Sequence, residues 1–385
     1  MENEPPLAGL KVLELARVLA GPWAGQLLAD LGAEVIKIES PSGDETRHWG
    51  PPFHGKDSSA YFQSANRGKK SVTADLKDKD GCFMVQALAQ RADVIIENFK
   101  VGGLKKYNLD YTSVKKNNHS IVYCSITGFG QNGPNAKKLG YDFIIQAMGG
   151  IMDLTGEANG EPQKPGVAYA DLFTGLYSVI AIQSALLARQ ESGKGTYIDM
   201  SLFDTQIGVL ANQGASYLKT GINPTRMGNA HPVIVPYQKF DTCDGSIIIA
   251  CGNDGQFRKL CTAFGWKFHT NKKYKKNENR VLNRNTLVTQ IQERLSTLTK
   301  AETISKLGKA GVPGGAINSV AEALNDQQAL HRGMVYKING ESAIRTPIVF
   351  DSFSLKYKNL SPKLGQHTNE IREELNNNLV WKNKS

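Results

Sequence analysis

The first 130 residues alternate short apolar runs with longer segments of helical periodicity. Leucine-rich or β-branched runs occur at 10–15, 34–39, 93–99 and 121–130. Between them, 20–33 and 79–92 show helical patterns, and Gly32 closes the first of these. Strands that alternate with helices of this length are typical of βαβ units with right-handed crossovers. We therefore expect an α/β protein built on a Rossmann-like open parallel sheet.

The pattern changes after residue 170. Two long apolar helices are predicted at 171–190 and 201–220, separated by a turn and strand at 192–200. A hairpin-like segment at 240–252 is followed by small amphipathic helices. The predicted domains are a large Rossmann-like domain whose first part is 1–224, a smaller α+β domain at 225–330, and a C-terminal segment, 331–385, that returns to the large domain. The polar tail 374–385 is expected to fray.

Composition is that of an ordinary soluble globular protein. The chain has 385 residues, 40% of them hydrophobic and 21% charged, and no run approaches the roughly 18 apolar residues of a membrane span. The start, MENEPPLAGL, lacks the order of a secretory leader, so we expect a cytoplasmic protein without membrane contact. Five scattered cysteines form no CxxC pair, which favours reduced thiols over disulfides or a zinc site.

The formal net charge of +10 leaves two kinds of partner open. A non-catalytic nucleotide or nucleic-acid binder is one, although the cations are scattered apart from KKYKKNENR at 272–280. A site for a phosphorylated small molecule explains the excess equally well. A dinucleotide site has little support, because no GxGxxG follows the first strand, and no P-loop motif occurs.

Three loops that follow predicted strands, 64–71, 97–107 and 135–143, are rich in cations and amides. Loops at the carboxyl ends of parallel strands share one crevice, where such groups could surround several phosphates. The candidates are three lysines and the backbone amides near two asparagines: Lys69, Lys106, Lys138, Asn66 and Asn98. Phe99 or Tyr141 could stack on a base. The alternative is that each lysine is a solvated surface charge.

Asp171 follows the small residues GVAYA and precedes a predicted helix. Aspartate is a favoured N-cap, because its carboxylate accepts hydrogen bonds from the first free amides and meets the positive end of the helix dipole. The same surroundings would hold the carboxylate ionised, and an ionised carboxylate among small residues is able to attack an acyl carbon. The pattern alone leaves both interpretations open.

Other catalytic motifs are scarce. Neither HExxH nor GxSxG occurs, so metal hydrolysis and a hydrolase triad have no support. The loop CGNDGQF, 251–257, lies between a predicted strand and helix. It is either an ordinary turn or a mobile flap over a site.

Together these segments resemble the family III CoA-transferases, which include formyl-CoA transferase, carnitine CoA-transferase and related acyl-CoA racemases. The similarity runs from PLAGLKVLELARVLAGP to KLGQHT at 363–368. Its most specific segments are LLADLGAEVIKIESPSGDETR, NRGKKSVTADLK, ADVIIENFKVGGLKKY, SITGFGQNGP, GYDFIIQAMGG and GVAYADLFTGLYS. The resemblance implies the family's fold, in which two ring-like subunits thread through each other as an interlocked homodimer.

Position-by-position matching carries the family's nucleophilic aspartate onto Asp171. The residues implied to contact CoA are Val18, Leu19, Asn66, Arg67, Gly68, Lys69, Asn98, Phe99, Lys100, Lys106, Lys138, Leu139, Gly140, Tyr141 and Asp142. The implied flap is Gly252, Asn253, Asp254 and Gly255. No metal and no tightly bound cofactor are implied, because acyl-CoA is the substrate. The resemblance implies a mixed anhydride on Asp171 and then an aspartyl-CoA thioester, exchanges between groups of similar energy for which positioning and charge stabilisation suffice.

Two departures from the family pattern bear on function. The racemases carry a proton-transferring histidine where this chain has Tyr141, and a glutamate near Asp254; a tyrosine is a poor base near neutral pH, so CoA transfer is favoured over racemisation or epimerisation. Ser40 stands where several relatives have an arginine for the CoA phosphates. That contact is then missing, or is supplied by Arg47 or another subunit.

The segments GNAHPVIVPYQKF, CGNDGQF, GVPGGAIN and GQHT resemble the branch with succinyl-CoA and dicarboxylate specificity. The resemblance therefore implies CoA transfer from an acyl-CoA, with succinyl-CoA as candidate donor, to a small dicarboxylic or hydroxy acid.

Overall fold

The structure, a computed structural model, describes residues 4–55, 57–357 and 359–381. The chain divides into two units, each described here by itself. The first falls within Met1–Ile151, Lys164–Ile222 and Arg332–Ser385, and the second is Met152–Gln163 with Asn223–His331. The prediction placed residues 152–163 in the large domain with the rest of 1–224, whereas they belong to the second unit. No change of composition marks these residues in the sequence.

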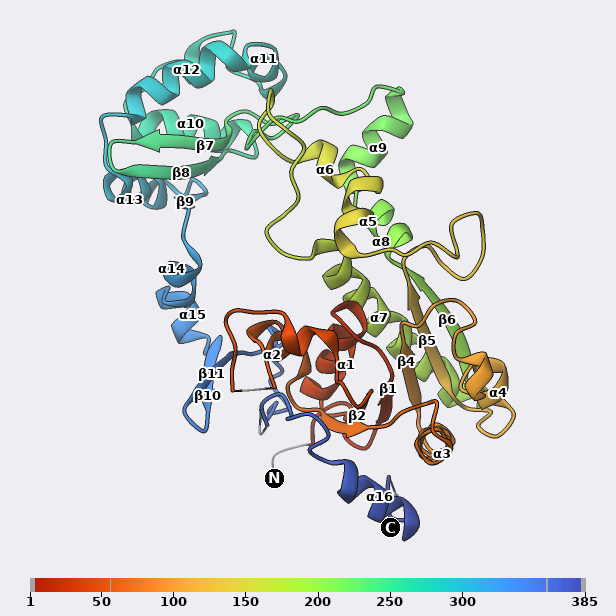
Figure 1. Ribbon diagram of the computed structural model, residues 1–385. Coiled ribbons are helices and arrows are strands. Elements are labelled where there is room, and N and C mark those ends of the chain that lie inside the picture. The colour runs from red at the N-terminus through yellow and green to blue at the C-terminus, as the bar shows by residue number, and fades with distance from the viewer. Residues whose placement is uncertain (1–3, 56, 358, 382–385) are drawn as a thin grey trace. The chain divides into compact units, whose positions relative to one another are not determined.

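A six-stranded sheet in the order β3-β2-β1-β4-β5-β6 forms the centre of the first unit (Figure 1). Every neighbouring pair is parallel. The strands are β1 Lys11–Glu14, β2 Glu34–Glu39, β3 Lys70–Thr73, β4 Val94–Glu97, β5 Val122–Thr127 and β6 Thr196–Ser201. The α/β class and the open parallel sheet are confirmed. The pattern missed β3, whose sequence KSVT contains a single large apolar residue.

Helices cover both faces of this sheet. On one face pack α1 (Ala20–Asp30) and α7 (Tyr169–Ser192). On the other pack α3 (Lys79–Ala89), α4 (Tyr111–Lys115) and α16 (Thr368–Asn376). Because neighbouring strand residues point to opposite faces, Val12 joins the first core and Leu13 the second. The remaining elements of this unit and its boundary are η1 Glu45–His48, α2 Ala60–Asn66, η2 Lys105–Tyr107, α5 Asp142–Met148, α6 Ile151–Leu154, α8 Leu202–Gly208, α9 Ala211–Thr220, β10 Val335–Ile338 and β11 Glu341–Ile344.

Two expectations about this unit are wrong. The segment 201–220 is not one helix but α8 and α9, which break where Ala211 has φ +46°. The tail was expected to fray from residue 374, yet Val380 and Trp381 are buried in the core beneath α3 and α16. Residues 382–385 lie outside the described residues.

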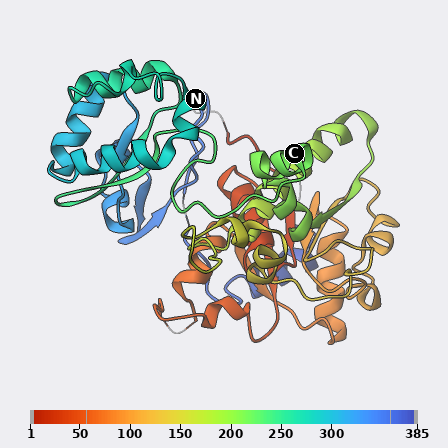
Figure 2. The same ribbon diagram turned by 90° about the horizontal axis from the view of Figure 1, so that it is seen from above.

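The second unit has its own antiparallel sheet, in the order β7-β8-β9. Its strands are β7 Tyr237–Thr242, β8 Gly245–Ala250 and β9 Gly314–Ala316, so the first two overlap the predicted hairpin. Helices pack against this sheet around Phe240, Ile247 and Phe257 (Figure 1, Figure 2). They and the segments beyond them are α10 Asp254–Ala263, η3 Phe268–Thr270, α11 Asn277–Leu282, α12 Arg284–Leu295, α13 Lys300–Ala310, α14 Val320–Leu324 and α15 Gln327–His331.

Candidate functional site

The parallel strands deliver their following loops to one edge of the sheet, and β1 lies at its centre, where the strand order reverses. The turn after β1 contains Val18, whose φ of +69° is in the left-handed region, and Leu19. Asn98, which follows β4, clamps the residue before Val18. Its Oδ1 accepts the Arg17 N–H at 2.9 Å, and its Nδ2 donates to the Arg17 carbonyl at 2.7 Å. The structure thus brings Val18, Leu19 and Asn98 together.

Asp171 is the third residue of α7 and is not its N-cap. Ala168 holds the N-cap position, and no side chain there makes a capping hydrogen bond. Asp142, the first residue of α5, caps α7 instead. Its Oδ1 accepts the backbone N–H of Ala170 at 2.8 Å and that of Asp171 at 3.3 Å. Gln146 Nε2 holds the other carboxylate oxygen of Asp142 at 2.7 Å. The interpretation of Asp171 as the helix cap is therefore wrong.

The Asp171 side chain lies in a nearly dry environment, and only 8% of the residue is exposed. Burial, and after it the nearby Asp142 carboxylate, raise the pKa of Asp171 from 3.8 to about 7. The helix end was expected to keep this carboxylate charged, but Asp142 takes the amides that would have done so. Near pH 7 Asp171 is therefore divided between its protonated and ionised forms. No described residue donates a side-chain hydrogen bond to it.

Tyr61, on α2, belongs to this site and was missed by the sequence analysis. Burial and the negative charges of Asp171, Asp142 and Asp44 raise the pKa of Tyr61 to about 12. Its hydroxyl therefore lies within the field of all three carboxylates. The ring packs edge-on against Trp49, with the centroids 5.1 Å apart. No pattern signalled this residue, because α2 has only seven residues and no apolar stripe.

Several predicted CoA-contacting residues are open to solvent. Lys100, Lys106 and Lys138 are exposed, as are Leu139 and Tyr141. They lie on the loops that follow β4 and β5, at the same edge of the sheet as the turn after β1. Their charges are therefore available to an anionic ligand, as the sequence analysis expected of Lys106 and Lys138.

Gly140 anchors its loop by close backbone approach. A Cβ at this position would lie 2.6 Å from the Cα of Gly128, just beyond β5. No larger residue fits there without a shift of the backbone. The loop 138–142 is thereby held against the end of β5, next to α5.

Phe99 does not have the role that was considered for it. Its ring packs against the core beneath α3, so it is not free to stack on a base. Its backbone N–H donates to the Glu97 carboxylate at 2.7 Å, and Ser125 donates its hydroxyl to the same carboxylate. Burial raises the pKa of Glu97 to about 7. Glu97 thus shapes the turn that carries Asn98.

The segment 66–69 also departs from expectation, because its polar side chains are buried and paired. Lys69 Nζ lies 2.8 Å from a Glu14 oxygen and donates to Asn66 Oδ1 at 2.9 Å. Burial lowers the pKa of Lys69 to about 8. Arg67 Nε donates to Asp30 at 2.8 Å. The expectation that the Lys69 side chain contacts a phosphate is therefore wrong for this structure. The accessible part of the segment 66–69 is the backbone at Gly68, which has φ +75° and is exposed.

Arg47 cannot replace the arginine that is missing at Ser40. The Arg47 guanidinium is buried and donates twice to the Glu39 carboxylate, at 2.7 Å from both Nε and Nη2. Ser40 is exposed and its hydroxyl lies 2.9 Å from that of Ser42. Arg17, half exposed and paired with Glu45 at 3.2 Å, is a cation at the same edge of the sheet.

The predicted flap residues form the start of α10 in the second unit. Asn253 is the N-cap and its Oδ1 accepts the Gln256 N–H at 2.9 Å, while Gln256 Oε1 accepts the Gly252 N–H at 2.7 Å. Asp254 pairs with the buried Arg280 at 2.8 Å. These contacts connect the first turn of α10, which contains Gly255, to its surroundings, and its role as a flap stays a prediction.

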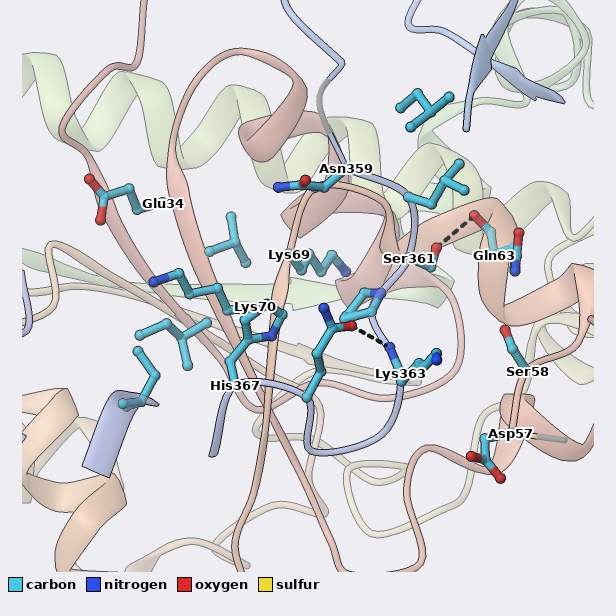
Figure 3. A pocket seen from close by; sticks show the side chains of 18 of the residues that line it. Glu34, Asp57, Ser58, Gln63, Lys69, Lys70, Asn359, Ser361, Lys363 and His367 are labelled. Atoms are coloured by element: carbon cyan, nitrogen blue, oxygen red, sulfur yellow. Dashed lines mark hydrogen bonds between the residues drawn. The ribbon is translucent and has the colours of Figure 1, made fainter. Parts of the chain in front are cut away.

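A cavity of about 1030 Å³ lies in the first unit, between β2, β3 and the C-terminal segment (Figure 3). Some of its polar groups have partners within the fold, since Lys70 pairs with Glu370 at 2.6 Å and Ser361 donates to the Gln63 carbonyl at 3.2 Å, whereas the Ser58 hydroxyl has no hydrogen-bond partner among the described residues. Asp171 is not among its described lining residues. The cavity therefore does not include Asp171, although Gly68 and Lys69, two of the predicted CoA contacts, line it. Within the described ranges no cluster of three or more His, Cys, Asp or Glu side chains could hold a metal ion.

Comparison with known proteins covers nearly the whole chain. The model of CoA-transferase family III matches residues 7–368. A relative named succinate–glutarate CoA-transferase, from Agrobacterium fabrum, is 49% identical over 97% of this chain and 96% of its own. The human succinyl-CoA:glutarate CoA-transferase is 41% identical over 97% of this chain and 87% of its own. The crystal structure of a CaiB/BaiF family protein from Brucella suis has 55% identity and a TM-score of 0.89, and the match covers 97% of this chain and 100% of that one.

Proposed function

The chain belongs to CoA-transferase family III, and we propose that it moves CoA from succinyl-CoA to a small dicarboxylic acid such as glutarate. The donor and acceptor are supported by the names of its two similar relatives, one bacterial and one human. The observation that carries the chemistry is the buried, unengaged carboxylate of Asp171 beside the loops at the sheet edge. A carboxylate that has lost its water shell is a stronger nucleophile toward a thioester carbon.

The reaction runs as a sequence of acyl exchanges at Asp171. The ionised carboxylate attacks the thioester carbon of succinyl-CoA, the C–S bond breaks, and an aspartyl–succinyl anhydride and CoA thiolate result. The thiolate then attacks the aspartyl carbonyl, which releases succinate and leaves an aspartyl-CoA thioester. The acceptor carboxylate attacks that thioester, and the thiolate released takes up the new acyl group from the second anhydride. The Asp171 carboxylate is regenerated without gain or loss of a proton.

The residues proposed to hold CoA divide into two groups. The exposed cations Lys100, Lys106 and Lys138 supply charge to the phosphates. The turn at Val18 and Leu19 supplies backbone contacts. A further set supports these loops from beneath: Asn66, Arg67, Lys69, Asn98 and Phe99. Leu139, Gly140 and Tyr141 complete the exposed rim.

The test is exchange of CoA between succinyl-CoA and a panel of carboxylic acids, read by mass spectrometry. Asp171→Asn should abolish exchange, and hydroxylamine added to wild type with succinyl-CoA should leave a hydroxamate on Asp171. Asp93→Asn, at the amino end of β4 where Asp93 accepts the Lys11 N–H, is the matched control and should retain activity. Full exchange by Asp171→Asn would refute the proposal. Incorporation of deuterium at the α-carbon without an acceptor acid would indicate racemisation instead.

We also propose that the enzyme is a homodimer, interlocked as the family resemblance implies, in the cytoplasm. The support is the apolar face of α7, where Ile180 is 58% and Leu187 is 65% exposed. By length and composition alone α7 is apolar enough to cross a membrane, but its Val179 and Ile182 pack in the core of the first unit. A second copy that covers the exposed face would account for the rest of its apolar surface.

A further inference from the structure

Val18 has an unusual backbone conformation for its residue type. Six described non-glycine residues have positive φ, and Val18, at +69°, is the one that is branched at Cβ. A β-branched residue in the left-handed region crowds its own backbone, and such a residue persists only where its surroundings hold it. The turn after β1 is therefore kept in place by something other than its own sequence.

The Asp44 carboxylate is the group that reaches the Val18 backbone. The Val18 N–H points at both of its oxygens, at 3.3 and 3.4 Å. Asp44 follows β2 and is only 1% exposed. Its Oδ1 also accepts the Thr46 N–H at 3.0 Å and the Thr46 hydroxyl at 2.8 Å, so its orientation is fixed.

Lys37, on β2, ties this carboxylate to the other side of the turn. Its Nζ lies 3.0 Å from Asp44 Oδ2 and donates to the Ala16 carbonyl at 2.8 Å. Glu14 Oε1 accepts a third hydrogen bond at 3.0 Å, so all the Lys37 donors are used in a fully buried setting. Lys37 and Asp44 thereby hydrogen-bond to the turn at two points, the carbonyl of residue 16 and the N–H of residue 18.

We propose that Asp44 is a positioning residue: its carboxylate, fixed by Lys37, holds Val18 in the left-handed conformation and so presents the Val18–Leu19 turn to CoA. This role rests on the proposed function. It differs from a merely structural ion pair because it acts through one backbone conformation. Glycine adopts that conformation without strain, so a glycine at position 18 removes the need for Asp44.

The test is a double-mutant cycle of Asp44→Asn and Val18→Gly, read by the KM for succinyl-CoA, kcat and the Kd for CoA. Asp44→Asn alone should raise KM and Kd about tenfold, equivalent to about 1.4 kcal/mol, with kcat within about twofold. The Val18→Gly variant should itself have a modestly raised KM, because the turn loses rigidity. Adding Asp44→Asn to that variant should raise KM and Kd by less than about twofold further. Asp93→Asn, which also removes a carboxylate that pairs with a cation and accepts a backbone N–H, should leave KM and Kd as they are.

Equal effects of Asp44→Asn in both backgrounds would overturn the positioning role. If Asp44→Asn does not fold, the double variant decides: a folded double variant that binds CoA supports the role, and a second failure to fold refutes it. Wild-type protein that binds no CoA would refute the proposed function and this inference with it. Wild-type binding with additive effects would refute this inference alone.

Discussion

Replacing Asp171 with asparagine is expected to stabilise the protein at pH 8 and to leave its stability nearly unchanged at pH 4. Burial and Asp142 raise the pKa of Asp171 from 3.8 to about 7. Between these two values the folded protein holds a proton that the unfolded chain has lost, so its free energy of unfolding falls as pH rises. The loss is complete above about pH 7. The asparagine variant does not lose this free energy of unfolding, because asparagine carries no charge at any of these pH values.

The size of the effect follows from the same shift. A difference of about three pH units corresponds to about 4 kcal/mol, at about 1.4 kcal/mol for each unit. Partial hydration of the ionised group lowers this figure, since 8% of Asp171 is still exposed, and we expect about 2 to 4 kcal/mol at pH 8. Urea unfolding of both proteins at several pH values, followed by tryptophan fluorescence, measures the difference. A variant that is less stable at pH 8, or a gain that grows toward acid, would refute the reasoning.

Asp44→Asn is the matched contrast, with the opposite sign. Burial opposes ionisation of Asp44, but Lys37 and the hydrogen bonds from Thr46 outweigh it and lower the pKa of this carboxyl. The ionised group therefore contributes stability that is present above its unfolded value, near pH 4, and is lost as pH falls through the lower folded value. The same chemical change should thus destabilise the protein at pH 8, and less so in acid.

Three further predictions concern activity and assembly. Asp142→Asn keeps a cap for α7 but removes the second cause of the raised pKa of Asp171, so the acidic limb of kcat/KM against pH should move to lower pH; a limb that stays or moves up contradicts this. Asn98→Ala deletes both hydrogen bonds to the turn after β1 and should raise the KM for succinyl-CoA about five- to tenfold with kcat retained, in steady-state assays. Ile180→Lys should lower the yield of dimer recovered on refolding from urea, measured by light scattering, whereas Phe83→Lys, on the exposed side of α3, should not; equal yields from both variants would argue against the α7 interface.

The sheet was predictable from the sequence where its strands are buried on both faces. β1, β2, β4 and β5 each place buried apolar residues on both faces, because helices cover both sides of them. β3 is an edge strand of four residues, and its place is set by pairing with β2 and by α16 rather than by its own pattern. The break between α8 and α9 was equally invisible, since apolar periodicity continues through Val209 and Leu210.

Which lysines meet the ligand was not predictable from the loops alone. Lys69 and Lys106 occupy similar stretches of cations, amides and glycines. Lys69, which precedes β3, is nevertheless buried against Glu14, which lies 55 residues earlier on β1, beyond β2 in the sheet, and Lys106 remains exposed. A residue's local pattern predicts that a loop is cationic, but only the tertiary partner decides whether its charge is used inside the fold or offered to a ligand.

The state of Asp171 shows the same limit in its chemistry. Capping rules assign the free amides of a helix to the nearest aspartate, and an aspartate so engaged would be ionised and have its lone pairs occupied. Asp142, from another helix, accepts the amides of residues 170 and 171 instead. Asp171 is thereby left buried, with a raised pKa and lone pairs that no described side chain engages. A nucleophile needs those lone pairs, so the structural role of one aspartate is what frees the other to react.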